Sequence, residues 1–326
     1  MKKVLISLVL VMTISLKTKA EQMIDTTNKV SFFTPESEYS KKRMQSLIGF
    51  WSISYSGFSY GLYQSWYKNQ SLQPFHLFND SREWQQMDKA GHMFSGYFQM
   101  AYNYNMSKWT GLDSRKSLLY SSAISTFFLT TLEFFDGFGE GWGFSIPDMA
   151  SNIIGTSSFY IQQTFWDEQR ILIKESVAPR RYSENLITVN GVTTSLEERA
   201  KKLYGNGLLQ RALKDYNVQT YWLSISPHAF GLERWPSWLN ISIGYGAEGM
   251  FGGLNNIWQT SDGLFDFSQQ KRYRQFYLAP DINLNKIKTG SPFLKSVFSA
   301  ANIIKTPTPA LEYNIKDGFV IHLIFF

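Results

Sequence analysis

Three polar clusters lie among long aromatic and aliphatic stretches in the first half of the chain, and their residue types could support acid–base chemistry. Their members are Asp88, Lys89 and His92; Glu133 and Asp136; and Ser145, Asp148 and Asn152. Asp88 and His92 share a helical face at i, i+4, and so do Asp148 and Asn152. An unpaired charge in apolar surroundings is costly, so we expect the clusters to face one another.

Two roles fit such a set of residues. In the first, the charged groups form a buried ion-pair and hydrogen-bond network that fixes the register of the helices. In the second, a hydrolase or transferase that acts on an envelope lipid or glycan uses His92 as general base or acid, and Asp88 or Asp136 orients the ring. Structural ion-pair networks also perturb pKa values without any catalytic role, so the sequence favours the first role.

A metal-dependent version of the site would use His92 with Glu133, Asp136 and Asp148 as oxygen ligands. One His and scattered acids are a weak metal signal, so we predict neither a metal nor another cofactor. The remaining polar residues are candidates for binding, namely Ser145, Asn152 and Trp142. Ser145 lacks the G-x-S-x-G context of a nucleophile and stands where a helix N-cap is expected. Trp142, in a Gly-rich turn, fits a packed turn better than a ligand loop.

The composition excludes several classes of protein. The 326 residues contain no Cys, which rules out a disulfide framework, a thiolate metal site and a Cys nucleophile. The formal charge of +6 includes four Lys in the first 20 residues, where there is no acid. The remaining residues carry a net charge near zero, which gives little support to nucleic-acid binding.

Residues 1–20 have the pattern of a secretory signal peptide. Two Lys are followed by an apolar run over 4–16 and then by Thr18-Lys19-Ala20. The pattern predicts cleavage after Ala20 and a mature protein in the periplasm or at the outer membrane. A membrane lipid or an envelope protein is the expected partner, and the oligomeric state is left open.

The helical pattern covers four segments, at about 41–67, 81–108, 114–135 and 145–174. Asp113 or Ser114 could cap the third segment, and Ser145 with Pro147 opens the fourth. Residues 45–67 contain no charged residue, and this stretch is long enough for a membrane span. Their many Ser residues favour a buried helix, or one at a membrane surface, instead. We predict a four-helix bundle over residues 41–176.

The rest of the chain has a different residue pattern. Residues 177–220 are a polar connector with one good helix, which Ser195 and Glu198 open as a capping box. Residues 221–326 are β-rich, with strands predicted at 221–226, 239–246, 274–284 and 319–326, and a helix at 292–304. The fold class is therefore α+β, a four-helix bundle followed by a small antiparallel region. Four strands are too few for a closed membrane barrel, so the last strand should pair within a small sheet.

The clusters also resemble a known family. Asp88-Lys89-Ala-Gly-His92, Glu133-Phe-Phe-Asp136 and the run from Gly141-Trp142 through Ser145-Ile-Pro-Asp148 to Asn152-Ile-Ile-Gly155 are similar to the YfiM-type predicted periplasmic lipoproteins over about residues 75–170. A weaker resemblance is to the VanZ-like membrane proteins. Both imply a cell-envelope protein, and neither supplies an active site. The lipoprotein members carry a lipidation Cys that this chain lacks.

The sequence therefore predicts a bacterial cell-envelope protein, structural or interacting in role. The alternative is an envelope lipid- or glycan-modifying hydrolase or transferase that uses His92 with Asp88, Asp136 and Asp148. Under either role, Lys89 or His92 should contact Asp136, Asp148 or Glu133, and most of these side chains should be buried.

Overall fold

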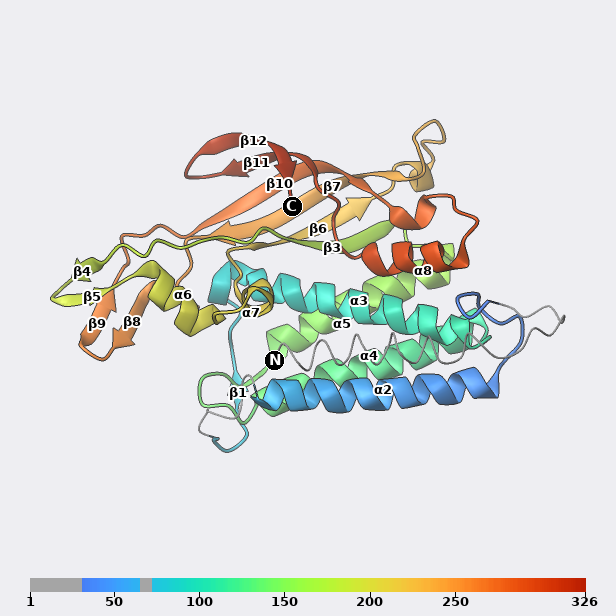
Figure 1. The fold of residues 1–326 in the computed structure, drawn as a ribbon, viewed down its shortest axis with the longest axis horizontal. Coiled ribbons are helices and arrows are strands. Elements are labelled where there is room, and N and C mark those ends of the chain that lie inside the picture. Colours follow the sequence, from blue (N-terminus) through green and yellow to red (C-terminus); the bar gives the residue numbers. More distant parts are fainter. Residues whose placement is uncertain (1–30, 65–71) are drawn as a thin grey trace, which may run out of the picture. The chain divides into compact units, whose positions relative to one another are not determined.

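The computed structural model describes residues 31–64 and 72–326, so the predicted signal peptide lies outside the described residues. Residues 35–326 form one compact unit, and it is an α+β structure (Figure 1). Its α-helices are α2 Lys41–Leu62, α3 Met87–Trp109, α4 Ser114–Asp136, α5 Ile146–Trp166, α6 Leu196–Tyr204, α7 Leu208–Lys214 and α8 Pro292–Ala301.

The main sheet has six strands in the order β12-β11-β10-β7-β6-β3, and every neighbouring pair is antiparallel. Its strands are β3 Ile171–Val177, β6 Gln219–Ile225, β7 Leu239–Glu248, β10 Tyr273–Ile282, β11 Thr308–Asn314 and β12 Gly318–Phe325. The short pairs are β1 Leu77–Phe78 with β2 Phe144–Ser145, β4 Ile187–Val189 with β5 Val192–Thr194, and β8 Ile257–Thr260 with β9 Gly263–Asp266. The last strand pairs with β11 in an open sheet order, as predicted.

The helical part packs around α3. This helix contacts α4, α5 and the strands β3, β6 and β7, and Figure 1 shows it between the sheet and the other long helices. The shared core includes Met87, Phe94, Met100, Ile173 and Tyr221. The sheet therefore supports the helix that carries the first polar cluster.

Two glycines allow α3 and α5 to approach closely. A Cβ added at Gly155 would lie 2.0 Å from the carbonyl oxygen of Met93, and one at Gly96 would lie 2.4 Å from that of Asn152. Side chains cannot occupy such positions, so glycine is required at both.

The predicted boundaries of two helices are wrong. The helix expected from residue 81 begins at Met87, because Trp84, Gln85 and Gln86 have left-handed backbone angles within the short helix η2 (Glu83–Gln86). The helix expected to run to 174 ends at Trp166, where Asp167 takes φ of 53°. Residues beyond that point form β3, whose Ile171 and Ile173 favour a strand.

The helix α2 is more exposed than predicted. Ile53 is 72% exposed and Phe50, Phe58 and Tyr60 are also exposed, whereas Leu47 is buried. It touches its neighbours through Trp51, whose indole donates to Asn103 Oδ1, and through Tyr55 against Phe127 and Phe128. Of the two alternatives, the buried helix is therefore wrong, whereas the helix at a membrane surface and the four-helix bundle stay predictions.

Among the described helices, α4 has the length and composition of a membrane span. Core helices of soluble proteins meet the same criterion, so we do not assign a span to it.

Candidate functional site

Three long helices and one short strand pair bring the polar clusters together. Parallel pairing of Phe78 with Ser145 sets the segment after β1 beside the start of α5. The first turns of α3 and α5 and the last turn of α4 then meet at one end of the helices. Ser145 caps α5 as predicted, because its Oγ accepts a hydrogen bond from the backbone N–H of Asp148 at 3.1 Å.

Lys89 is the centre of the carboxylate cluster. Its Nζ lies 2.5 Å from Asp148 Oδ1, 2.6 Å from Asp80 Oδ1 and 2.7 Å from Asp88 Oδ2. The predicted contact between Lys89 and Asp148 is therefore confirmed. One ammonium faces three carboxyl groups, so the cluster holds more acid than this cation can balance.

His92 lies on the same face, with its two ring nitrogens in different surroundings. Nδ1 lies 3.2 Å from Asn152 Oδ1 and 3.5 Å from Glu133 Oε1, so two acceptors surround it. Nε2 lies 3.7 Å from both Asp88 Oδ1 and Asp148 Oδ2, beyond hydrogen-bond length. When Nδ1 carries hydrogen it can donate to Asn152 Oδ1, and Nε2 then faces Asp88 and Asp148. The His92 side chain is 25% exposed, compared with 7% for Asp148 and 2% for Glu133.

Two members of the cluster were missed in the sequence. Asp80 binds Lys89 and also accepts a hydrogen bond from Ser145 Oγ at 2.7 Å. Tyr216, from the loop between α7 and β6, donates its hydroxyl hydrogen to Asp88 Oδ1. Asp80 directly precedes the segment predicted as a helix from residue 81, where an Asp fits a helix cap, so its sequence position does not point to the cluster. Tyr216 carries no local signal, because only the tertiary fold brings the connector to α3.

The two aspartates beside His92 have opposite pKa shifts. Burial alone would raise the pKa of Asp88, but attraction to His92 and Lys89 and the hydrogen bonds from Lys89 and Tyr216 bring it below its usual value. Burial and then repulsion from Asp88 raise the pKa of Asp148 to about 9. Burial opposes the charge of Lys89, yet the surrounding carboxylates raise its pKa. These pKa shifts favour the ionised form of Asp88, the protonated form of Asp148 and the cationic form of Lys89 at neutral pH.

Glu133 is a second protonated acid. Burial, followed by repulsion from Asp136 and Asp88, raises its pKa to about 8. Asp136 is half-buried at the end of α4 and acts on Glu133 through its charge. The direct contact expected between Asp136 and Asp148 stays a prediction.

The candidate binding residues have separate surroundings. The Nδ2 of Asn152 is buried without a hydrogen-bond partner among the described residues. The Nε1 of Trp142 is likewise buried and unpaired there, and its ring lies against Gly139, as expected of a packed turn. Of Ser145, Asn152 and Trp142, Asn152 is therefore the residue that contacts His92 and also has an unused hydrogen-bond donor, its Nδ2, among the described residues.

Asp88, His92 and Asp148 could hold a metal ion, since one ligand atom from each lies within 4.8 Å of the others. However, Lys89 already contacts both aspartates and supplies their cation. These contacts of Lys89 argue against a metal ion at the three residues.

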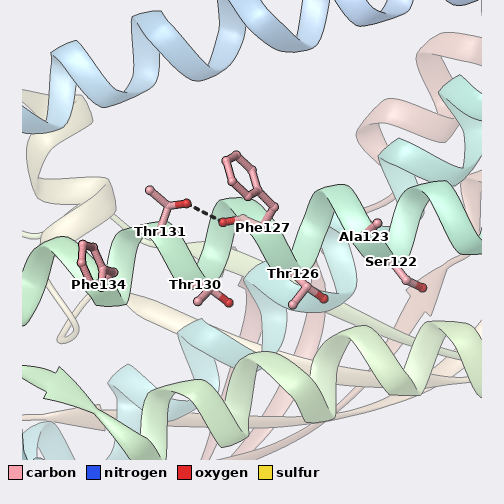
Figure 2. A pocket seen from close by; sticks show the side chains of 7 residues that line it. All are labelled: Ser122, Ala123, Thr126, Phe127, Thr130, Thr131 and Phe134. Atoms are coloured by element: carbon pink, nitrogen blue, oxygen red, sulfur yellow. Dashed lines mark hydrogen bonds between the residues drawn. The ribbon is translucent and has the colours of Figure 1, made fainter.

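An open apolar groove of about 650 Å³ runs along α4. Figure 2 shows the side chains that line it, which are Ser122, Ala123, Thr126, Phe127, Thr130, Thr131 and Phe134. The groove reaches Phe134, the residue after Glu133. Glu133 itself points into the buried cluster, so the groove and the cluster lie on different sides of the end of α4.

Comparison with known proteins finds one family. No curated protein and no solved structure matches the chain. The family match supports a place in the periplasm or cell envelope, and it leaves the finer resemblance to YfiM-type and VanZ-like proteins as a prediction. Residues 77–164, which carry the cluster except for Tyr216, match the family described as predicted periplasmic lipoprotein (DUF2279).

Proposed function

We propose that the protein is a cell-envelope hydrolase or transferase of the periplasm or outer membrane, with His92 as its general base. The observation that carries this proposal is the position of His92 Nε2, which lies 3.7 Å from Asp88 Oδ1 and 3.7 Å from Asp148 Oδ2. The pKa of Asp88 is lowered and that of Asp148 is raised. A pair of titratable groups whose pKa values are pushed apart is the usual arrangement of an acid–base site. His92 is also the more exposed of these groups, as contact with a substrate requires.

In a hydrolysis, His92 Nε2 takes a proton from the attacking water, and Asp88 stabilises the imidazolium that forms. Asp148 supplies a proton to the leaving oxygen as the scissile bond breaks. The Asn152 amide holds the ring by accepting from Nδ1–H. Lys89 keeps the two aspartates at a fixed separation through its contacts with both.

The substrate class, an envelope lipid or glycan, stays open. The apolar groove on α4 matches an acyl chain, but it lies on a different side of the end of that helix from the cluster that holds His92.

The second candidate is a structural or interaction protein of the periplasm or outer membrane. The support for it is that Lys89 ties three segments together, the turn before η2 through Asp80, α3 through Asp88 and α5 through Asp148. Such a network fixes helix register without catalysis.

One experiment separates the two candidates. The purified full chain is incubated with phosphatidylethanolamine–phosphatidylglycerol vesicles or with peptidoglycan, and products are identified by mass spectrometry. Products from the wild type that disappear in a folded His92→Gln variant support the enzyme. Equal product, or none, from both proteins would favour the structural role.

A further inference from the structure

On the main sheet, many buried side chains are polar and many exposed side chains are apolar, which is the reverse of the usual arrangement. The inner face carries many buried polar side chains beside a small cluster that contains Trp222 and Tyr277. The polar ones include Lys174, Ser224, Asn240, Asp281 and Glu312. Lys174 and Asp281 are both 0% exposed and form an ion pair at 2.7 Å. A sheet that borders water on one face places its apolar side chains inward, so the outer face should be polar here.

The outer face is apolar instead. Its exposed side chains, here named the outer apolar face, are Leu223, Ile241, Ile243, Phe276, Leu278, Leu311, Tyr313, Phe319, Ile321 and Leu323. They occupy alternate positions of β6, β7, β10, β11 and β12. Outward apolar and inward polar alternation is the pattern of a strand that faces lipid.

The strand register arranges these side chains in rows. One aliphatic row crosses five strands, because the paired residues are Leu223, Ile243, Leu278, Leu311 and Ile321 in turn. The next row is aromatic. Its members Phe276, Tyr313 and Phe319 are exposed on β10, β11 and β12, whereas Tyr221 and Tyr245 continue the row into the core against α3. On the other side of the aliphatic row, Ile241 pairs with Pro280 and with Ile225.

The rim beyond the aromatic row is charged. Arg274 is the next outward residue of β10, Lys271 precedes that strand, and Lys316 lies in the turn between β11 and β12. All three are exposed, and Asp317 is the acid beside them. Aromatic side chains next to cationic ones are typical of the level of the lipid headgroups.

The depth of the band matches one leaflet. Rows two residues apart are separated by roughly 7 Å, so three rows cover about 14 Å along the strands. The hydrocarbon of a bilayer is about 30 Å thick, which gives about 15 Å for each leaflet. The outer apolar face is thus deep enough to enter one leaflet and too shallow to cross both.

We propose that the outer apolar face inserts into one leaflet of a phospholipid bilayer, with Lys271, Arg274 and Lys316 against anionic headgroups. The proposal does not depend on the chemistry of the carboxylate cluster. The charges favour lipid over a second copy of the chain, because the cationic rim would face its own like charges in a symmetric pair. The central rows also lack the polar groups that supply the hydrogen bonds of protein interfaces.

The test uses the absence of Cys from the chain. Leu278→Cys in the full chain is labelled with an environment-sensitive fluorophore and mixed with vesicles of three parts phosphatidylethanolamine to one part phosphatidylglycerol. The matched control is Leu264→Cys, a leucine of similar exposure on β9 of the separate β8–β9 pair. We expect a blue shift at position 278 and none at position 264. An unshifted probe at 278 overturns the proposal.

Charge variants give a second readout. Leu278→Asp and Ile321→Asp should each reduce flotation with the same vesicles by about tenfold, because a carboxylate is costly in hydrocarbon. Leu264→Asp should float like the wild type, and circular dichroism checks that all three fold. Equal flotation of all variants overturns the proposal. Analytical ultracentrifugation without vesicles gives the other outcome that overturns the proposal. That outcome is a dimer that Leu278→Asp and Ile321→Asp lose and Leu264→Asp keeps, because a second copy of the chain would then cover the face.

Discussion

His92 and Asp148 come from different helices, yet His92 Nε2 lies 3.7 Å from Asp148 Oδ2. The separation is too long for a hydrogen bond and short enough for a proton to pass through one bound group or water. Asp88 Oδ1 lies at the same distance on the other side of the ring nitrogen. This three-residue arrangement is the basis of the first prediction.

The His92→Gln variant should lose turnover on the envelope substrate by about 10²–10⁴-fold, because it removes the proton acceptor. Its thermal midpoint should stay close to that of the wild type, since Gln keeps a polar group beside Asn152. The matched control is His228→Gln, since the His228 ring contacts the Trp235 carbonyl and lies outside the cluster. Loss of folding together with turnover would contradict the catalytic role.

Removal of the central cation should destabilise the fold. The Lys89→Met variant leaves carboxylates of the cluster without their ammonium, which should cost about 3 kcal/mol of unfolding free energy. Combination with Asp88→Asn should recover part of that loss, because one of the unpaired charges is then removed. Urea unfolding measures both effects.

The control for this variant is Lys116→Met. Lys116 pairs with Asp113 at 3.2 Å, but both side chains are more than half exposed. Its removal should change stability by less than about 1 kcal/mol. Equal losses for Lys89 and Lys116 would contradict the buried cluster.

Stability should fall as pH rises from about 5 to 9. Glu133 has a folded pKa of about 8, above its usual value of 4.5, so the folded protein binds a proton that the unfolded chain releases. That contribution is complete below the unfolded pKa and is lost as pH rises through 8. Asp148, with a pKa of about 9, acts in the same direction.

Glu133→Gln should therefore reduce the slope with which the free energy of unfolding falls between pH 5 and 8, by up to about 1.4 kcal/mol for each pH unit. Urea unfolding at a series of pH values provides the measurement, and Glu140→Gln, at an exposed position, is the control. A variant whose pH profile matches the wild type would show that Glu133 is ionised in the folded protein.

Chelation should leave turnover unchanged if Lys89 is the cation of the cluster. The protein is dialysed against EDTA, and both product formation and bound metal are measured. Loss of turnover that Zn²⁺ or Mn²⁺ restores would assign Asp88, His92 and Asp148 to a metal instead, since their ligand atoms lie within 4.8 Å of one another.

The contact between α3 and α5 gives a test of the helix packing. Gly155→Ala should cost about 1–3 kcal/mol, because the added Cβ would lie 2.0 Å from the Met93 carbonyl oxygen. Gly57→Ala on α2 is the matched control, since no atom lies within 4 Å of its Cβ position. It should be neutral or stabilise by up to about 1 kcal/mol, because Ala is the better helix former. Thermal unfolding compares the two variants.

Local patterns were sufficient for part of the fold. The caps predicted at Asp113, Ser145 and Ser195 are all present, because a cap depends on a side chain and a backbone N–H three residues later. The convergence of Lys89 with Asp148 also followed from spacing, since i, i+4 residues share a helix face and short turns make successive helices neighbours.

Other elements could not be predicted in this way. β11 was missed because Pro307 and Pro309 suggest a loop, whereas the structure accommodates Pro309 at a register shift between Thr308 and Ala310. The sequence predicts the residues of β3, Ile171–Val177, as the end of a helix, because no strong turn residue separates them from α5. The break comes at Asp167, whose left-handed backbone angle is set by the packed structure.

The sequence by itself determined which side chains carry charge, which helix faces hold them and where the helices are capped, because these depend on residues within a turn of one another. Only the tertiary structure decided that Asp80 and Tyr216 join Lys89 and Asp88, since their neighbours are set by contacts between distant segments. It also decided which face of each strand is buried. Alternation makes the two faces differ, whereas the surroundings decide which side chains are buried. Here many polar side chains are buried, and much of the apolar face on β10, β11 and β12 is exposed.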